Sequence, residues 1–489
     1  MAEAFLLLGG GPCLLRRIGR AGRRGPEIVL GVVMVRITFY GAVRTVTGSM
    51  HHVDAGGTRL LLDCGLFQGT RAEAAETNSR FPFPPSSIDA VVLSHAHLDH
   101  CGNLPTLVGA GFQGPIYCTP ATQDLVALVL HDSAKVQHQN AHSINKIRRR
   151  QDQPPVVPLY TSADVDRTIG RLRGIAYGTP VQVGAARIRF ANAGHILGSA
   201  ITVVEADGRV LGFTGDLGRQ TAPLLRPPET PPALDALITE STYGDRDHEP
   251  YAAAVPRLGE AVRQSVARGG TVMIPAFAID RTQDITYALY HLAADQVAAV
   301  PTFVDSPMAV NATQIYRRHP EGLNEAIRSE LERHADPFGS TAIHYIREIE
   351  ESQALNSRTD PFIVIATSGM CESGRILYHL SHRIGDPRAA LLLVSFQAVN
   401  TLGRRLADGV SPVHILGETY DVRLEVKVLP AFSSHADRSE ILAWLRKIPR
   451  VGHVYCVHGE EAQSLALARQ LAAAGYAADV PTYGQQIEV

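Results

Sequence analysis

The feature that most constrains this chain is a group of four candidate metal ligands within six residues, at positions 95–100. The group follows the apolar run 90–93, and a β-branched apolar run that ends in polar residues is typical of a buried strand entering a loop. Alternate residues of an extended segment point to the same side, so His95 and His97 can share one metal ion. Asp99 and His100 follow where the chain turns and can reach a second ion. Imidazole and carboxylate ligands together favour zinc, although a polar loop that is rich in histidine by chance would read the same way.

Three further candidate ligands lie at the ends of other predicted strands. His195 lies in a loop flanked by glycines, Asp216 lies between two glycines, and His458 directly follows an apolar run. Each of them alone is more often a capping or loop residue than a ligand. Their occurrence together with the 95–100 group favours a metal site, and an open position on the metal would make that site catalytic.

The rest of the chain predicts two kinds of region. Strands and tight turns dominate residues 35–240, with a hairpin turn at Asp207-Gly208 and one long helix predicted over 121–136. From about residue 246, strands alternate with helices, a pattern that indicates a parallel α/β sheet. The predicted strands are 271–276, 302–305, 362–367 and 389–395, and the predicted helices are 251–268, 281–293 and 374–382, with a polar helical stretch up to about residue 355.

From about Val426 the earlier pattern returns, with strands at 426–429 and 453–457 and helices at 438–447 and 461–473. We therefore predict a metal-binding domain formed by residues 34–245 and 426–489. An inserted α/β domain of residues 246–425 interrupts it.

Residues 1–33 differ from the rest because five arginines follow a short apolar run. A secretory signal would place its positive charge before the apolar region. Two readings remain: a disordered basic tail, or an upstream start codon with the native start at Met34. The strand alternation that begins at Val35 favours the second.

Composition narrows the class of partner and the compartment. The 489 residues suffice for two domains, and the net charge of −2 gives no bulk attraction for a polyanion. A nucleic acid would therefore bind in a local cleft. The six cysteines form no Cys-x-x-Cys pair, which indicates reduced thiols of a cytoplasmic protein. The sequence has no run of about 18 apolar residues, so we do not expect a membrane span or a membrane partner.

Together these residues resemble the motif set of a known family. The 95–100 group with Asp63, His195 and Asp216 resembles the signature of the metallo-β-lactamase fold. Glu240, His435 and His458 resemble the three additional motifs of its β-CASP subfamily, which includes ribonuclease J and the endonuclease subunit of the eukaryotic cleavage and polyadenylation factor. The resemblance covers essentially everything from Met34 onward. It implies an α/β fold: a metallo-β-lactamase αββα sandwich with an inserted parallel-sheet α/β (β-CASP) domain.

The resemblance also implies roles for the residues at the site. One zinc ion would be held by His95, His97 and His195, a second by Asp99, His100 and His458, and Asp216 would bridge them. Two such ions about 4 Å apart can activate a water molecule and clamp a scissile phosphate. Asp63 would orient ligands from behind, and His435, held by Glu240, would donate a proton to the departing ribose oxygen. A buried structural histidine is the alternative for His435.

Polar residues at strand ends of the inserted domain are candidates for binding RNA phosphates. They are Arg281, Ser306, Ser368, Gly369 and Ser395. Helix capping explains a serine at such a position equally well, and the resemblance favours a phosphate role for Ser368 and Arg281. The basic segment 143–153 is more typical of a solvated helix face than of a phosphate-binding rim.

These observations predict a zinc-dependent ribonuclease that cleaves single-stranded RNA, internally or from the 5′ end, in RNA processing or decay. A β-CASP nuclease acting on DNA is the second reading, but the RNA-acting branch has histidine at the motif of His458. A small-molecule hydrolase fits the inserted domain less well, because a domain that spans a cleft suits a polymer. A non-catalytic RNA-binding subunit conflicts with the intact ligand set. A homodimer is a candidate assembly.

Overall fold

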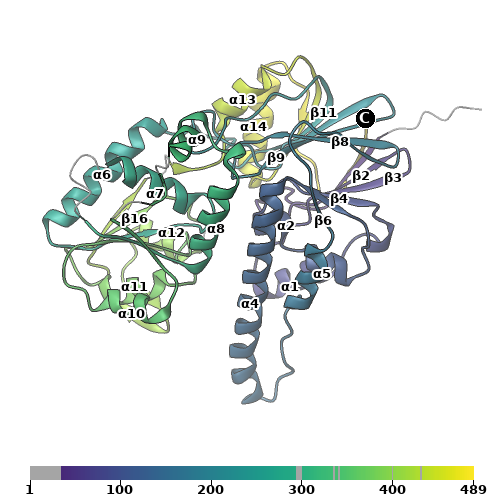
Figure 1. Ribbon diagram of the computed structural model, residues 1–489. Coiled ribbons are helices and arrows are strands. Elements are labelled where there is room, and N and C mark those ends of the chain that lie inside the picture. Colours follow the sequence, from purple (N-terminus) through teal and green to yellow (C-terminus); the bar gives the residue numbers. More distant parts are fainter. Residues whose placement is uncertain (1–34, 293–299, 334–335, 340–341, 399, 430–431) are drawn as a thin grey trace, which may run out of the picture. The chain divides into compact units, whose positions relative to one another are not determined.

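The computed structural model describes residues 35–292, 300–333, 336–339, 342–398, 400–429 and 432–489. The expectations for residues 1–33 lie outside the described residues. Figure 1 shows the chain coloured along its sequence, with the elements labelled.

The metal domain is built on two seven-stranded sheets. The first has the order β22-β1-β2-β3-β4-β5-β6 and the second β21-β20-β11-β10-β9-β8-β7. The strands of the first are β1 Arg36–Phe39, β2 His51–Ala55, β3 Thr58–Leu62, β4 Ala90–Val92, β5 Ile116–Cys118, β6 Leu172–Gly174 and β22 Gln486–Glu488. Those of the second are β7 Val181–Val183, β8 Ala186–Asn192, β9 Ala200–Ala206, β10 Arg209–Phe213, β11 Leu234–Glu240, β20 Val451–Val457 and β21 Ala478–Asp479.

Period-2 alternation of the strands explains how the two sheets stack. Leu60 and Leu62 of β3 join the same apolar cluster as Ile238 of β11, so this cluster fills the space between the sheets. The intervening Leu61 points the other way and packs in a cluster with helices α2 Leu98–Cys101, α3 Leu104–Gly109, α4 Pro120–Arg149 and α5 Ser162–Ile169. Helix α1 is Arg71–Ser79. Leu237 of β11 likewise packs with α13 Arg438–Leu445 and α14 Glu461–Ala473. The result is the predicted αββα sandwich.

Helix α4 extends well beyond the predicted 121–136. It begins after the capping hydroxyl of Thr119 and runs without interruption to Arg149, because no glycine or proline follows Pro120 until Pro154. The basic segment predicted as a solvated helix face forms its last turns, and Lys146 and Arg149 are exposed there. None of the described helices is both long and apolar enough to cross a membrane.

The inserted domain is a six-stranded parallel sheet with helices on both faces. Its order is β14-β13-β15-β12-β16-β19. The strands are β12 Val272–Pro275, β13 Thr302–Asp305, β14 Ile343–Ile346, β15 Ile363–Ala366, β16 Ala390–Leu393 and β19 Glu425–Val428. One face packs with α6 Tyr251–Ala267 and α7 Arg281–Leu292, and the other with α11 Ile376–Arg383 and α12 Leu402–Ala407. The remaining elements are η1 Pro85–Ser87, α8 Pro307–Arg318, η4 Pro320–Gly322, α9 Glu325–Glu332, α10 Ile349–Asn356, β17 Val413–Ile415 and β18 Glu418–Tyr420.

Two expectations for this region differ from the structure. The strand predicted from Val426 is β19, and it pairs with β16 in the inserted sheet, so the boundary at 425/426 falls too early. A four-residue strand in which charged and apolar residues alternate carries no local mark of the sheet that it joins. The stretch predicted to be helical up to Leu355 contains β14, which pairs with β13. Its β-branched isoleucines favour a strand.

Contacts from α8 and from the two residues before α9 connect the inserted domain to the metal domain. The hydroxyl of Tyr316 accepts a 3.5 Å hydrogen bond from the backbone N–H of Leu197, in the loop that carries His195. Leu323 forms an isolated bridge with Leu225, and the N–H of Asn324 donates to the carbonyl of Leu224 at 2.9 Å. The inserted domain therefore supports one of the ligand loops directly.

Candidate metal centre and active site

Every candidate ligand lies just beyond the end of a strand of the metal domain, in a loop or, for Asp99 and His100, in the short helix α2 that follows the loop. Asp63 follows β3, the 95–100 group follows β4, Asp216 follows β10 and His458 follows β20, while His195 lies between β8 and β9. Strands β3 and β4 are parallel, as are β10, β11 and β20, so within each sheet these strand ends meet at one edge.

Close backbone approaches hold these loops together. A Cβ atom on Gly65 would lie 1.6 Å from the carbonyl oxygen of Asp99, and one on Gly218 would lie 1.8 Å from that of Gly194. Only glycine fits at either position. Asp63 and His458 have positive φ angles of 59° and 48°, which are uncommon for residues with side chains and typical of functional sites.

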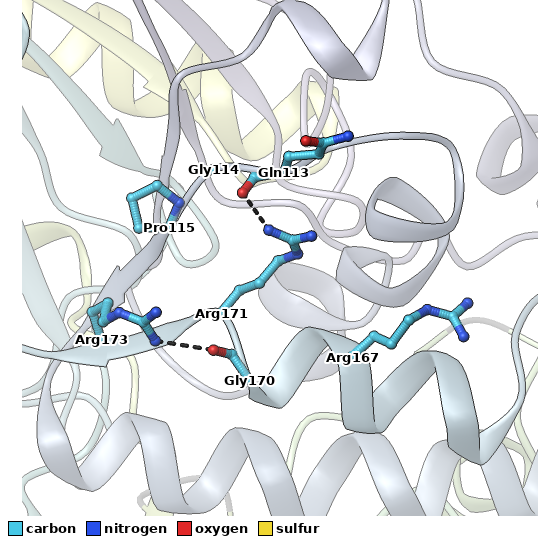
Figure 2. Close-up of a pocket in the computed structure, with 7 residues that line it drawn as sticks. All are labelled: Gln113, Gly114, Pro115, Arg167, Gly170, Arg171 and Arg173. Carbon is cyan, nitrogen blue, oxygen red and sulfur yellow. Dashed lines mark hydrogen bonds between the residues drawn. The ribbon is translucent and has the colours of Figure 1, made fainter.

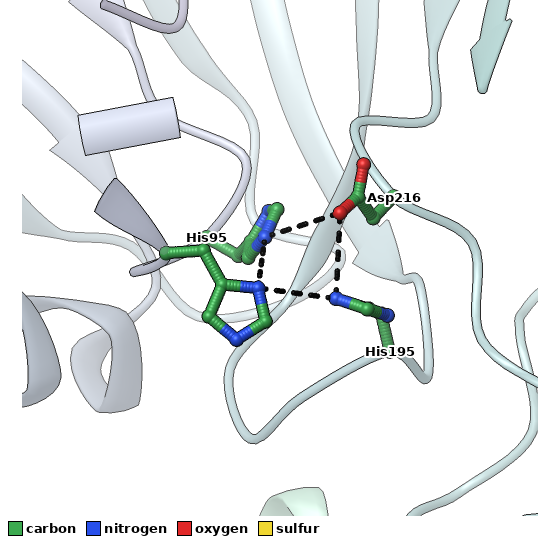
Figure 3. A group of neighbouring side chains, drawn as sticks. His95, His195 and Asp216 are labelled. Carbon is green, nitrogen blue, oxygen red and sulfur yellow. Dashed lines mark hydrogen bonds and ion pairs between the residues drawn. The ribbon is translucent and has the colours of Figure 1, made fainter. Parts of the chain in front are cut away.

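The first cluster consists of His95, His97, His195 and Asp216. The Nδ1 atom of His97 lies 3.1 Å from Nε2 of His95 and 3.3 Å from Nε2 of His195. Oδ2 of Asp216 lies 3.5 Å and 3.4 Å from the same two Nε2 atoms. Figure 3 shows His95, His195 and Asp216 converging from three separate loops.

These separations fit a tetrahedral zinc ion. Zinc binds imidazole and carboxylate atoms at about 2.0–2.1 Å, and a tetrahedron of that size has ligand atoms about 3.3–3.4 Å apart. The four donor atoms of the cluster meet that spacing within about 0.3 Å at each separation given above, an order-of-magnitude match to ideal geometry. No such fit would be expected of a loop that is merely rich in histidine.

The second cluster consists of Asp99, His100 and His458. The Nε2 atom of His458 lies 3.2 Å from Nε2 of His100 and 3.5 Å from Oδ2 of Asp99. The other oxygen of Asp216, Oδ1, lies 3.3 Å from Nε2 of His100 and, although buried, makes no hydrogen bond to any residue that the structure describes. The two oxygens of Asp216 therefore face different clusters, as a bridging carboxylate requires.

Burial sets the charge state of the first cluster. It lowers the pKa of His95, His97 and His195, and for His95 and His195 the pKa falls well below its usual value. Neutral imidazole is the form that binds a metal ion. Burial would also lower the pKa of His100, but the carboxylates of Asp216 and Asp63 outweigh it and raise that pKa.

Asp63 lies behind the second cluster, where it contacts His100. Its Oδ2 lies 2.7 Å from Nδ1 of His100, which leaves Nε2 of that ring facing the cluster. Ser94 donates to Asp63 from its N–H at 2.8 Å and from its hydroxyl at 2.9 Å, and Ser49 donates at 3.1 Å. A carboxylate fixed in this way orients the imidazole and strengthens it as a ligand.

His435 lies beside both clusters and is held by Glu240. Its Nδ1 lies 2.9 Å from Oε2 of Glu240, and the buried Glu240 also accepts the N–H of Leu217 at 2.6 Å. The ring of His435 packs on that of His195 with 4.5 Å between centroids. Burial opposes charge on His435, but the Glu240 carboxylate raises its pKa to about 9. The structure therefore brings together all ten metal-domain residues singled out in the sequence.

Arg281 has partners inside the protein. It is only 5% exposed, and its Nη1 donates to Asp284 and its Nη2 to Ser434, each at 2.7 Å. Ser434 in turn donates to Asp280 at 2.7 Å. A phosphate contact from the terminal nitrogens of Arg281 would have to compete with these bonds.

The other phosphate candidates lie at the carboxyl edge of the inserted sheet, with different surroundings. Ser306 caps α8 by accepting the N–H of Ala309, and Ser368 accepts the N–H of Glu372 at 3.0 Å. Ser395 has a buried hydroxyl with no hydrogen-bond partner among the described residues. The side chain of Gln397 donates to the carbonyls of Gly369 and Ser395 and so joins their two loops.

Two exposed aromatic residues at this edge were not among the candidate residues named from the sequence. Phe277 follows β12 and is 40% exposed, and Phe396 follows Ser395 and is 43% exposed. The ring of Tyr243 lies 6.3 Å from that of Phe396 and 6.1 Å from that of His435. An aromatic residue among polar residues at a strand end is the sequence feature that could have indicated a role in binding RNA, because exposed rings can stack on unpaired bases.

Comparison with known proteins places three family models in order along the chain. The beta-lactamase superfamily domain matches residues 58–276, the Beta-Casp domain residues 282–406, and the Zn-dependent metallo-hydrolase RNA specificity domain residues 419–481.

Similar proteins cover nearly the whole chain. A ribonuclease of Thermus thermophilus is 39% identical over 93% of this chain and 100% of its own length. The transcription termination factor FttA of Methanocaldococcus jannaschii is 32% identical over 92% of this chain and 71% of its own. An RNase J-like protein of the same organism is 31% identical over 89% and 95%. A solved structure, a protein of unknown function from Enterococcus faecalis, matches the fold with a TM-score of 0.53 at 14% identity, covering 93% of this chain and 100% of that one.

Proposed function

Because the chain belongs to the β-CASP family of metallo-β-lactamase-fold proteins, we propose that it is a zinc-dependent ribonuclease that hydrolyses phosphodiester bonds of single-stranded RNA. The observation that carries the proposal is the pair of donor clusters that share Asp216, with His435 beside them. The names of the similar proteins support RNA as the substrate, as does the RNA specificity domain matched over residues 419–481.

Two zinc ions would occupy the clusters, one held by His95, His97 and His195 and the other by Asp99, His100 and His458, with Asp216 between them. Bound there, zinc supplies Lewis-acid polarisation of the phosphate and activation of a water molecule. Asp63 would keep His100 oriented through its Nδ1 atom.

The chain's own proton donor in this proposal is His435. Its Nδ1 is held by Glu240, so Nε2 is the nitrogen left to face a substrate. A protonated Nε2 would donate to the ribose oxygen that leaves when the phosphodiester bond breaks. Glu240 is fixed by the N–H of Leu217, so the imidazole is oriented before the substrate arrives.

The carboxyl edge of the inserted sheet would hold the RNA strand. Ser368, Gly369 and Ser395 would contact a phosphate, and the exposed rings of Phe277 and Phe396 would stack on bases. Stacking needs unpaired bases, which favours a single strand over a duplex. Five buried cysteines without disulfides support action in a reducing compartment, which we take to be the cytoplasm.

The proposal is tested with the purified full chain on RNA labelled at the 5′ end and, separately, internally. We expect cleavage that chelator abolishes and zinc restores, and the two labels distinguish internal cutting from digestion at the 5′ end. A DNA strand of the same sequence serves as the control for the alternative nuclease. Cleavage of the DNA but not the RNA would overturn the proposal, as would activity that persists in chelator.

A further inference from the structure

A cavity lies at the opposite edge of the first sheet from the candidate metal centre. Its volume is about 400 Å³, and it is lined by Arg167, Arg171 and Arg173 together with Gln113, Pro115 and Gly170 (Figure 2). Strands β4, β5 and β6 are parallel. The cavity lies where β5 and β6 begin, whereas the 95–100 group lies where β4 ends. The cavity is therefore separate from the proposed active site.

The lining is cationic and largely uncompensated. It contains three arginines and no carboxylate. Arg167 pairs with Asp164, but neither Arg171 nor Arg173 forms an ion pair within the described part of the chain. Arginines that line one cavity without a carboxylate make its electrostatic potential positive, which favours a bound anion.

Backbone contacts hold two of these arginines in place. Nη1 of Arg171 donates to the carbonyl of Gln113, and Nη1 of Arg173 donates to that of Gly170 at 3.0 Å, as the dashed lines of Figure 2 show. The Nε atom of Arg171 is buried and has no hydrogen-bond partner in the described part of the chain. Since a guanidinium has five N–H donors, both side chains keep unused donors.

These observations indicate a phosphate ligand. The planar fork of arginine matches two phosphate oxygens, and several arginines together suit a phosphate better than a single carboxylate. The volume lies within the range of small-ligand sites and exceeds what one inorganic phosphate needs.

We propose that Arg167, Arg171 and Arg173 form a binding site for a ribonucleotide phosphate that is distinct from the catalytic centre. Two sources share this chemistry: the backbone of an RNA that extends beyond the active site, and a free nucleotide. Since RNA is the substrate in the proposed function, the first source rests on that function. It would let the enzyme hold a long RNA at a second point.

The test compares the Arg171→Gln, Arg173→Gln double variant with the unaltered pair, both in a His435→Ala background so that bound RNA is not cut. We expect affinity for a long unstructured RNA to fall about tenfold at low salt. The plot of log affinity against log salt concentration should become less steep by about 1.4, because two phosphate contacts are lost and each contact to a single strand contributes about 0.7 to the steepness.

The matched control is Arg187→Gln, Arg189→Gln, which removes the same charge from β8, where both arginines face Glu205. Binding by the cavity variant that equals binding by this control overturns the RNA source. Titration with adenosine 5′-monophosphate tests the other source: loss of one nucleotide site in the cavity variant supports it. If neither ligand distinguishes the variants, the site does not exist.

The Arg171→Lys, Arg173→Lys variant guards against misfolding, because it keeps the charge and removes only the fork. This lysine variant should keep the salt dependence of RNA binding seen with the arginine pair. It should bind the long RNA or adenosine 5′-monophosphate more weakly than the arginine pair does, and equal binding overturns the proposal. Failure here remains distinguishable from failure of the proposed function, because in that case the wild-type chain would not cut RNA at all.

Discussion

His435 and His458 lie near the same carboxylates but have different neighbours, so we expect their removal to have different effects. His458 lies among the ligands of the second cluster, whereas Nδ1 of His435 is bound by Glu240. The distinction depends on which nitrogen of each ring faces which partner, so each histidine can be tested separately.

We predict that His435→Ala keeps both zinc ions and the affinity for RNA but lowers the cleavage rate about 10²–10⁴-fold, the usual contribution of general-acid catalysis. His458→Ala should instead lose zinc and activity together. Metal analysis, RNA binding and single-turnover cleavage of both variants check this. Wild-type cleavage by His435→Ala would show that the assignment of the acid is wrong.

Arg281 offers a second test at the level of a single residue. Burial raises the pKa of Asp284 to about 8, so Arg281→Gln would remove a hydrogen-bond donor from a largely neutral buried carboxyl, and we predict a loss of about 1–3 kcal/mol in the free energy of unfolding. The salt dependence of RNA binding should remain as in the wild type, because the guanidinium is engaged inside the protein.

Denaturant unfolding and salt titration measure the two effects. The control is Arg263→Gln on α6, whose exposed pair with Glu260 should contribute less than about 1 kcal/mol. A flattened salt slope with unchanged stability would return Arg281 to the role of a phosphate contact.

At the scale of elements, one buried carboxylate joins three pieces of the inserted domain. Asp305, the last residue of β13, accepts hydrogen bonds from Ser352 of α10 at 2.6 Å and from Arg375 before α11 at 2.6 Å, and lies 2.7 Å from Nε2 of His379. Burial opposes its charge, but these partners lower its pKa below the ordinary 3.8.

The sign of the pH effect follows from that lowered pKa. A depressed carboxyl pKa stabilises the folded state above the unfolded value, and this stabilisation is lost as the pH falls through the folded value. We predict that Asp305→Asn is destabilised by about 2–4 kcal/mol at neutral pH. The difference from the wild type should shrink below about pH 4. Thermal unfolding at a series of pH values measures it, and a constant gap down to acid pH would contradict the prediction.

At the scale of the whole molecule, the metal centre joins distant parts of the chain. In the sequence, the 95–100 group precedes the inserted domain and His458 follows it, so the two come from opposite ends of the metal domain's chain. A metal ion that binds both should therefore stabilise the closed arrangement of the entire domain.

We predict close to two zinc ions per purified chain and a melting temperature that falls when chelator removes them. Elemental analysis and calorimetry before and after chelation measure this, and re-addition of zinc should restore the transition. A melting temperature that ignores both treatments would count against a metal centre at these clusters.

The arrangement also predicts how the substrate is selected. Phosphate contacts fix a strand without reading its sequence, and stacking on Phe277 and Phe396 requires unpaired bases. We expect cleavage of unstructured RNA with little sequence preference and stalling at stable hairpins. Efficient cutting within a long perfect duplex, or dependence on one short sequence, would contradict this picture.

The αββα sandwich and the roles of Asp63, Glu240 and His435 were implied by the resemblance to the family, whereas the amino-acid sequence by itself predicted the inserted parallel α/β domain and the seven candidate metal ligands. These features depend on local patterns: alternation buries one side of a strand, and a polar or glycine residue marks the end at which a ligand can stand. Leu60, Leu61 and Leu62 of β3 face the sides that their alternation predicts.

Only the tertiary structure decided which partners those residues have. Whether the guanidinium of Arg281 is free depends on Ser434, which is distant in sequence. Whether β19 belongs to one sheet or another depends on its pairing with β16, and nothing in its four residues records that choice. The arginine cavity likewise exists only because β5 and β6 begin side by side, so the arginines at 167–173 share one space with residues 113–115, which are distant in sequence. Long-range pairing, unlike local periodicity, leaves no regular mark in a single sequence.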